Sequence, residues 1–300
     1  MNNKQSTNHI LMIDPAIFYA NPETMDSNHY QDEQSAGPTI DKTAEARAEF
    51  QALRDLLVAN GVVITEILGR DDCPDHIFPN WLSTMPDGRL TLYKMKDQSR
   101  KRELTPQIVD LFSRSYKLDL DFRDNTKENA NLESTASICR DHVNKIGYAA
   151  LSARTDRELA QQWADHYGYK LIAFDTSSHT GKPIYHTDVL MHIGTEVATI
   201  CAECITDDGE RQAVLESLRK THKVVELTMD QLLAFCGNAL EVRGAEDEKI
   251  LVMSESAYKA LSPAQIAVYE AHHDKILYTP LYTVERYGGG SARCMMLELF

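Results

Sequence analysis

Short apolar runs alternate with amphipathic helical segments along the whole chain, and this pattern predicts an α/β fold. Apolar runs bounded by turn residues predict strands at residues 10–13, 62–67, 90–93, 118–122, 138–141, 146–151, 171–174, 189–193, 197–201, 223–227, 239–242, 250–253 and 276–279. Apolar residues at helical spacing, together with capping residues, predict helices at residues 41–60, 155–166, 208–220, 228–235 and 262–273, and one that begins at Thr105 and Pro106. Residues 15–40, rich in Asn, Asp, Ser and Pro, predict a long loop.

The order strand, strand, helix, strand recurs about five times, at a spacing of roughly 45 to 55 residues. We expect the last repeat to be completed by a C-terminal strand around Cys294. No linker or low-complexity tract interrupts the pattern. The sequence therefore predicts a single domain over residues 9–300, preceded by a disordered polar segment at residues 1–8.

The composition excludes several classes of protein. Of the 300 residues, 43% are hydrophobic and 25% are charged, which indicates an ordinary globular protein. The net charge of −14 argues against nucleic acid as a partner, because phosphate binding needs a basic face. No apolar run approaches the roughly 20 residues of a membrane span, and the N-terminal residues lack the apolar stretch of a secretory signal. Six scattered cysteines are typical of a reducing compartment, so we expect a cytoplasmic protein.

Cys294 is the strongest candidate for chemistry. It lies in the segment Gly-Gly-Gly-Ser-Ala-Arg-Cys-Met at residues 288–295. A glycine turn allows close backbone approach, and the cation of Arg293 would favour the thiolate, which is the nucleophilic form. The alternative is a small buried cysteine that opens a C-terminal core strand, and the segment taken alone favours this alternative.

Three further segments carry polar groups that could serve such a nucleophile. His186 and Asp188 stand two residues apart, so on a strand both would project to one face, as a proton donor and as a carboxylate for a cation. Glu133 lies at a turn among small residues, which leave room for a ligand. The loop with Asp75 and Asn80 mixes polar and aromatic residues, as binding loops do. Each segment alone is also compatible with an ordinary surface turn or loop.

Cys201 and Cys204 have the spacing of metal ligands or of a redox pair. No second cysteine pair or histidine pair has a matching spacing, so core packing is the preferred interpretation. The chain has no phosphate-loop or dinucleotide signature.

Taken in order, these segments resemble the amidinotransferase and arginine deiminase superfamily, the penteins. The resemblance is closest to the bacterial citrulline-utilisation, amidinotransferase-like hydrolase branch, and it runs over nearly the whole chain. The matching stretches are residues 12–16 and 21–24, Phe-Pro-Asn-Trp at 78–81, the turn of Glu133, residues 148–156, His186 with Thr187, residues 235–241, and the terminal nucleophile loop at 289–295. The last of these is the most specific.

The resemblance implies a propeller of five pseudo-symmetric strand–strand–helix–strand units around a central polar cleft. It also implies that Cys294 is the nucleophile, that His186 is the general acid and base, and that Glu133 is the carboxylate beside the imidazole. A guanidinium held by carboxylates stays cationic, so a thiolate can attack its carbon and form a thiouronium intermediate. No metal or organic cofactor is implied.

The resemblance implies a small cationic guanidino substrate as the partner, with no role for nucleic acid or membrane, and a homodimer is possible. Asp188 and Asn80 would hold the guanidinium, and Asp75 is grouped with them as a substrate-binding residue. Arg293 would either bind a substrate carboxylate or orient the nucleophile loop.

The chain departs from the branch at three points. Two glycines of the turn Glu-Gly-Thr-Gly-Ser are replaced at 134 and 136, and side chains there would narrow the cleft. The Phe-Pro-Asn-Trp loop has one asparagine fewer, and Asp188 replaces an asparagine, which favours a cationic guanidine over neutral citrulline. We expect a hydrolase that converts arginine or a related compound to citrulline and ammonia, or to ornithine if it hydrolyses twice. The alternatives are amidino transfer to an amine, and a catalytically silent protein that binds a guanidino ligand or a protein partner.

Overall fold

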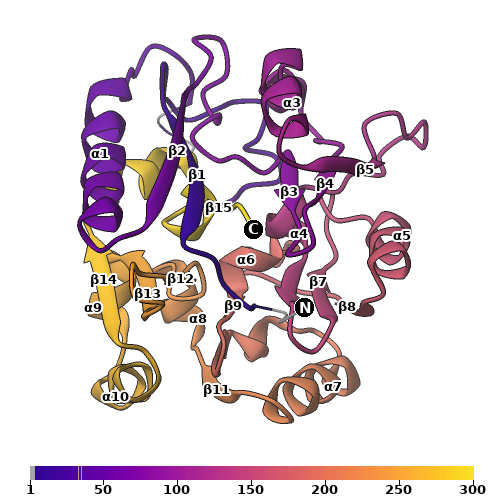
Figure 1. The fold of residues 1–300 in the computed structure, drawn as a ribbon, viewed down its shortest axis with the longest axis vertical. Helices are drawn as coiled ribbons and strands as arrows, with labels where there is room; N and C mark the ends of the chain where they lie inside the picture. The colour runs from indigo at the N-terminus through magenta and orange to yellow at the C-terminus, as the bar shows by residue number, and fades with distance from the viewer. Residues whose placement is uncertain (1–3, 33, 35) are drawn as a thin grey trace.

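The computed structural model describes residues 4–32, 34 and 36–300, and in this part of the chain the strands form five three-stranded sheets. Figure 1 shows the sheets arranged around a central axis, with the longer helices on the outside. The α/β class and the fivefold repeat predicted from the sequence are therefore confirmed.

Four of the sheets are built from strands that follow one another in the chain. They are β3 (Leu82–Thr84), β4 (Arg89–Leu92) and β5 (Lys117–Asp121); β6 (Cys139–Asp141), β7 (Ile146–Ala150) and β8 (Lys170–Phe174); β9 (Met191–Ile193), β10 (Val197–Ile200) and β11 (Lys223–Glu226); and β12 (Leu240–Arg243), β13 (Lys249–Ser254) and β14 (Lys275–Thr279). In each sheet the first two strands are antiparallel, and the third is parallel to the second.

Helices connect the parallel strands of every unit, because a parallel connection needs a crossover. The crossover helices are α1 (Thr43–Ala59), α3 (Pro106–Ser113), α5 (Arg157–Tyr167), α7 (Asp208–Arg219), and the pair α9 (Glu255–Ala260) and α10 (Pro263–His272). Shorter helical segments are α2 (Gln98–Lys101), α4 (Ser134–Ser137), α6 (Thr187–Leu190), α8 (Met229–Leu233), η2 (Ala202–Cys204), η3 (Val284–Gly288) and η4 (Arg293–Met295).

Local sequence explains where the crossover helices begin and what they bury. The predicted inward face of α1, with Phe50, Leu53 and Leu57, is fully buried. Helix α5 is capped by Asp156, whose side chain accepts hydrogen bonds from two backbone N–H groups of the first turn. The capping box expected to start at residue 155 is therefore wrong by one residue, because the carboxylate of Asp156 satisfies those donors.

The C-terminal strand closes the first unit and not the last one. β15 (Leu297–Glu298) pairs antiparallel with β1 (His9–Asp14), which in turn pairs parallel with β2 (Val63–Leu68). Cys294 precedes this strand, in the turn η4. The expectation that a strand around Cys294 completes the last repeat is thus wrong, because β12 already supplies the antiparallel partner of that unit. Pairing of the two chain ends closes the ring.

The polar N-terminal segment is packed against the propeller where the structure describes it. The side chain of Gln5 is buried and donates hydrogen bonds to the carbonyl oxygens of Arg140 and Ile193. The hydroxyl of Ser6 donates to Glu241 at 2.7 Å. The predicted disorder of residues 1–8 is therefore wrong for residues 5 and 6, since these contacts hold the backbone in place. Residues 1–3 lie outside the described residues.

The strands that form the antiparallel edge of each sheet contact those of neighbouring units, β6 with β9, β9 with β12 and β15 with β3. Helices α4 and α6 also contact each other, and both lie near the centre of the ring in Figure 1. Loops that precede or follow these inner elements therefore converge at the axis. In the part of the chain that the structure describes, no helix has the length and apolar character that crossing a membrane requires.

Candidate active site

A narrow cavity at the start of α6 brings together four of the seven predicted site residues. Asp75, Asn80, His186 and Cys294 all contribute to its wall. Its other lining residues are Asn28, Phe78, Arg100, Arg154, Tyr185, Gly288 and Gly290. The predicted convergence of the loop at 78–81, the His186 segment and the nucleophile loop is therefore present.

Cys294 is held by an asparagine from a neighbouring unit. The Nδ2 atom of Asn238 lies 3.1 Å from the sulfur, and Oδ1 of the same side chain accepts a hydrogen bond from the backbone N–H of Cys294. Nδ2 of Asn238 also lies 2.8 Å from the carbonyl oxygen of Asp188. Asn238 therefore fixes the nucleophile loop relative to α6, and its amide can donate to a thiolate. Sequence reasoning gave Asn238 no role, although it lies in the family-like stretch 235–241.

The glycines before Cys294 allow the loop to pass close to its neighbours. Gly289 has a φ of +62°, and a Cβ there would lie 2.6 Å from Oδ1 of Asn28. A Cβ at Gly288 would lie 2.7 Å from the ring of Phe78. Asn28 also donates to the carbonyl oxygen of Gly288 at 3.0 Å. The long N-terminal loop and the nucleophile loop are thus packed without room for side chains.

His186 is the N-cap residue of α6 and not part of a strand. The apolar run at 189–193 predicted a strand from residue 189, but residues 187–190 form a helical turn, in which the hydroxyl of Thr187 donates to the carbonyl oxygen of Ser137. Nε2 of His186 lies 2.7 Å from Oε2 of Glu133. The carboxylate accepts this proton, so Nδ1, which is buried and has no partner, is the nitrogen available for proton transfer.

Asp188 lies directly beside the candidate nucleophile. Its Oδ2 atom is 3.6 Å from the sulfur of Cys294, and its Oδ1 atom is buried without a hydrogen-bond partner. Burial raises the pKa of Asp188, although His186 and Arg293 oppose this. An unpaired carboxylate oxygen next to a thiol is a suitable contact for one nitrogen of a guanidinium.

Glu133 lies behind the imidazole, as predicted, but does not line the cavity. It is fully buried, and its Oε1 atom accepts a hydrogen bond from the backbone N–H of Lys96. Burial by itself raises the pKa of Glu133. The charge of Arg154 and the contact with His186 outweigh burial and lower this pKa to about 2. Glu133 is therefore ionised near neutral pH and can hold the imidazole in one orientation.

The residues that replace the two family glycines do not line the cavity. Ser134 adopts a positive φ of 55°, and its hydroxyl donates to the carbonyl oxygen of Leu82 at 2.5 Å. Ala136 is fully buried. The expected narrowing of the cleft by these side chains is therefore wrong, because one of them is turned toward the backbone of β3.

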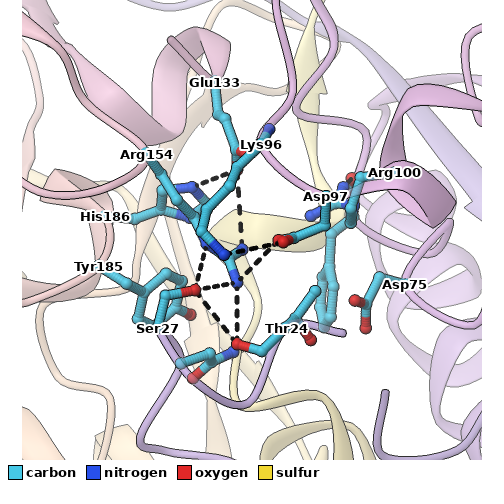
Figure 2. A network of polar contacts seen from close by, with 12 residues as sticks. Thr24, Ser27, Asp75, Lys96, Asp97, Arg100, Glu133, Arg154, Tyr185 and His186 are labelled. Atoms are coloured by element: carbon cyan, nitrogen blue, oxygen red, sulfur yellow. Dashed lines mark hydrogen bonds and ion pairs between the residues drawn. The ribbon is translucent and has the colours of Figure 1, made fainter. Parts of the chain in front are cut away.

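Arg154 is the most prominent site residue that sequence reasoning left without a role. Its guanidinium lies between Glu133, at 3.7 Å, and Asp97, at 3.6 Å, as Figure 2 shows. It also donates to the hydroxyl of Ser27 at 2.9 Å and to the carbonyl oxygen of Thr24 at 3.2 Å. Arg154 thus connects the long N-terminal loop with the carboxylate behind His186. Its position in the family-like run 148–156 is the sequence feature that could have identified it as a site residue.

Asp75 and Arg100 form a second buried polar group in the wall. Oδ2 of Asp75 accepts a hydrogen bond from Asn21 at 2.8 Å, and its Oδ1 has no partner. Arg100 donates through Nε and Nη2 to Glu103, at 2.7 and 3.0 Å. Burial raises the pKa of Asp75 and also raises that of Glu103, the latter to about 8. Asn80 is buried and lines the same cavity as Asp75 and Arg100.

Arg293 does not line the cavity that contains Cys294. Its guanidinium donates to the carbonyl oxygen of Met296 at 2.8 Å and lies 3.3 Å from Glu298. It lines a separate polar cavity together with Arg140 and His192. Its predicted role as a ligand of a substrate carboxylate is therefore wrong, because the side chain is bonded to its own C-terminal segment. The other expectation, that it orients the nucleophile loop, agrees with these contacts.

The family described as N,N dimethylarginine dimethylhydrolase, eukaryotic, matches residues 14–300. The chain belongs to this family. Membership in the dimethylarginine dimethylhydrolase family confirms the predicted class, a hydrolase of C–N bonds in amidines, and the predicted relationship with the penteins. No curated protein sequence matches the chain.

Solved structures confirm the fold of this dimethylhydrolase family member. The N-terminal domain of ArgZ, a cyanobacterial arginine dihydrolase, bound to substrate as a cysteine-to-serine variant, is 14% identical, with a TM-score of 0.73 and coverage of 97% of both chains. A dimethylarginine dimethylaminohydrolase in adduct with S-methyl-L-thiocitrulline is 15% identical, with a TM-score of 0.67 and coverage of 97% of this chain and 99% of that one. The chain spans only 40% of full-length ArgZ, at a TM-score of 0.71 and 15% identity.

Proposed function

We propose that this protein hydrolyses a guanidino C–N bond of free arginine or of an N-methylated arginine, through a covalent intermediate on Cys294. The observation that carries the proposal is the shared cavity of Cys294 and His186, with Asp188 in contact with the sulfur. This arrangement supplies a nucleophile and a proton carrier in one cavity wall, with a carboxylate for a cation in contact with the nucleophile.

The proposed reaction begins when the guanidinium of the substrate donates a hydrogen bond to Oδ1 of Asp188, which has no partner among the described residues. Burial and the charge of Asp188 raise the pKa of the Cys294 thiol in the empty site. A bound guanidinium offsets the negative charge of Asp188, so it favours transfer of the thiol proton to Nδ1 of His186. The thiolate attacks the guanidino carbon, and His186 delivers a proton to the departing ammonia or methylamine. Water activated by His186 then attacks the thiouronium carbon, which releases the ureido product and restores the thiol.

We propose a free amino acid as the substrate because the cavity is narrow and buried residues of the N-terminal loop lie against it. The buried residues Asn21, Thr24 and Asn28 of the N-terminal loop pack over it. Two guanidinium groups, of Arg100 and Arg154, line the same cavity. Arg100 donates to both oxygens of Glu103, whereas Nη1 of Arg154 has, among the described residues, only the distant contact with Glu133 at 3.7 Å. Arg154 is therefore the better candidate for a substrate carboxylate.

Turnover of a substrate series tests this proposal. We would incubate the protein with arginine, monomethyl- and dimethylarginine, agmatine, citrulline and an arginyl peptide, and measure ammonia, methylamines, citrulline and ornithine. We expect release of an amine from a free arginine compound, trapping of a thiouronium adduct on Cys294, and no turnover by Cys294→Ala. A matched control is Cys236→Ala, which removes a buried thiol that donates to the carbonyl oxygen of Ala257. Equal turnover by Cys294→Ala and the parent would refute the mechanism.

The same assay separates hydrolysis from amidino transfer. Addition of glycine as an acceptor amine would yield a new guanidino compound in place of the ureido product if the protein is a transferase. If folded protein turns over none of these compounds yet binds them, the catalytically silent alternative is correct.

A further inference from the structure

The thiols of Cys201 and Cys204 contact each other, which distinguishes them from the other cysteines. Their sulfur atoms lie 3.1 Å from each other, at the two ends of the turn η2 that follows β10. Cys73, Cys139 and Cys236 instead donate to backbone carbonyl oxygens. The pair at 201 and 204 thus has mutual contact where the other three thiols have fixed backbone acceptors.

The geometry of this turn is compatible with a disulfide. Residues three apart in a single helical turn have Cα atoms within the about 4.4 to 6.8 Å that a disulfide spans. The sulfur atoms would move closer by about 1 Å to reach the bond length of about 2.0 Å. Both cysteines are fully buried, but Glu203 between them is exposed, so the turn lies at the surface. Local opening of one short turn would admit an oxidant.

Two connections join the pair to the catalytic cavity. The backbone N–H of Cys201 donates to the carbonyl oxygen of Leu190, the last residue of α6, at 2.9 Å. In addition, Tyr30 of the N-terminal loop packs against the apolar cluster that contains both cysteines, and its hydroxyl is buried without a partner.

Tyr30 connects the cluster of the cysteine pair to the nucleophile loop through Tyr185. Its ring contacts that of Tyr185, with 5.8 Å between the ring centroids. Tyr185 lines the cavity and donates its hydroxyl to the carbonyl oxygen of Gly289. A shift of the turn η2 would therefore reach the cavity wall from two sides, through α6 and through the two tyrosines.

We propose that Cys201 and Cys204 are a reversible redox site, and that their oxidation to a disulfide weakens ligand binding in the catalytic cavity. Closure of the bond pulls η2 away from the positions that Leu190 and Tyr30 occupy beside the reduced pair. The statement on ligand affinity rests on the proposed function, whereas the statement on the disulfide does not.

The oxidant is a low-molecular-weight disulfide, such as oxidised glutathione. One cysteine thiolate attacks it, forms a mixed disulfide and releases one thiol. The thiolate of the second cysteine then attacks the protein sulfur of the mixed disulfide and releases the second thiol. The two cysteines lose two electrons and two protons, and the oxidant gains both. The hydrogen bond with Cys204, together with burial, raises the pKa of Cys201, so the reaction is expected to be faster at mildly alkaline pH.

Peptide mapping tests the disulfide. Folded Cys294→Ala protein, in which the catalytic thiol cannot react, is treated with oxidised glutathione at mildly alkaline pH, alkylated and digested. We expect the peptide with residues 201 and 204 to lose two hydrogen atoms and to carry no alkyl group, and dithiothreitol to reverse this. The variant Cys201→Ser in the same background should give no such peptide, whereas Cys236→Ser should behave like its parent. Full alkylation of both cysteines after oxidation would overturn the proposal.

Two readouts then test the coupling to the cavity. Titration calorimetry with L-arginine on the Cys294→Ala protein should show a roughly tenfold higher Kd after oxidation, and no change in the variant that also has Cys201→Ser. Hydrogen exchange, which needs no ligand, should become faster at residues 187–191 and 28–31. A disulfide that changes neither exchange nor affinity would refute the coupling. Failure of the reduced protein to bind arginine would count against the proposed function alone, since mapping and exchange still decide the redox site.

Discussion

The sulfur of Cys294 lies 3.6 Å from Oδ2 of Asp188, and both side chains are buried. In the empty site this carboxylate opposes ionisation of the thiol, because two negative charges so close together are unfavourable. In the occupied site the same carboxylate would hold the cation that the thiolate attacks. Under the proposed function, Asp188 together with burial would keep the thiol protonated until a positively charged ligand binds.

This relationship predicts the pH dependence of Cys294 alkylation. Burial, followed by the charge of Asp188, raises the pKa of the thiol, so iodoacetamide should react slowly at pH 7 and faster as the pH rises past the ordinary thiol pKa of about 8.5. Asp188→Asn removes the opposing charge and should be alkylated about tenfold faster at pH 7, which corresponds to a thiol pKa lower by about one unit. Its turnover should nevertheless fall by about a hundredfold, since the guanidinium loses its carboxylate.

The measurement is the rate of label incorporation at the peptide of residue 294, with Cys294→Ala as the blank. The conservative variant Asp165→Asn, at a position outside the cavity wall, serves as the matched control. Equal alkylation rates for Asp188→Asn and the parent would show that Asp188 does not govern the thiol.

Glu133→Gln should reduce both turnover and stability. The pKa of Glu133 is lowered to about 2 in the folded protein, from about 4.3 in an unfolded chain. A lowered folded pKa contributes stability that is fully present above about pH 4.3 and is lost as the pH falls toward 2. The variant leaves the buried guanidinium of Arg154 without this charged partner and weakens the contact with His186, so we expect a loss of roughly 3 kcal/mol at pH 7. We expect kcat to fall by at least about tenfold, because the imidazole is no longer oriented.

Urea unfolding at pH 7 and at pH 4 checks the direction in which the stability contribution of Glu133 changes with pH. The difference in unfolding free energy between the parent and Glu133→Gln should shrink at the lower pH. Glu158→Gln, on the exposed first turn of α5, is the control and should show little difference at either pH. A difference that grows as the pH falls would contradict the assignment.

Much of the fold could be predicted because the apolar periodicity is local. The alternation of short apolar runs with capped helices located every crossover helix except α9, and most strands. The closure of the ring was missed, because β15 has two residues and its pairing with β1 joins opposite ends of the chain. The run Val189–Met191 resembled the start of a strand, yet hydrogen bonds between Thr187 and the backbones of Ser137 and Ala150 hold a helical turn there.

The part of the candidate site that could be predicted consists of residues that stand in recognisable motifs. Cys294, His186 and Asp75 reach one cavity, as the motifs indicated. The direction of long side chains could not be read from the sequence. Arg293 is adjacent to the nucleophile in sequence but turns toward Glu298, whereas Arg154, distant in sequence, points into the site. Both outcomes depend on partners supplied by tertiary structure.

Arg154→Lys should distinguish arginine from agmatine, which lacks the α-carboxylate. A lysine keeps the positive charge beside Glu133 but loses the planar fork that matches a carboxylate. We expect the KM for arginine to rise by about tenfold, with a much smaller change for agmatine if the parent accepts it. Steady-state kinetics with both compounds provide the measurement, and Arg157→Lys, at an exposed position, is the control. An equal loss of kcat for both compounds would mean that Arg154 acts only through Glu133.

Two residues with positive φ, Gly289 and Ser134, should differ in how far substitution lowers the unfolding free energy. Gly289 has a left-handed backbone, and Gly289→Ala adds a Cβ that would lie 2.6 Å from Oδ1 of Asn28. We therefore expect the unfolding free energy to fall by about 2 kcal/mol. Turnover should also fall strongly, because the loop before Cys294 shifts. Ser134→Gly relieves backbone strain but removes the hydrogen bond to Leu82, so the unfolding free energy should change by less than about 1 kcal/mol. Urea unfolding and turnover of the two variants decide this. A stable, active Gly289→Ala protein would show that the nucleophile loop tolerates displacement, and the tight packing against Asn28 would then have no part in positioning the sulfur.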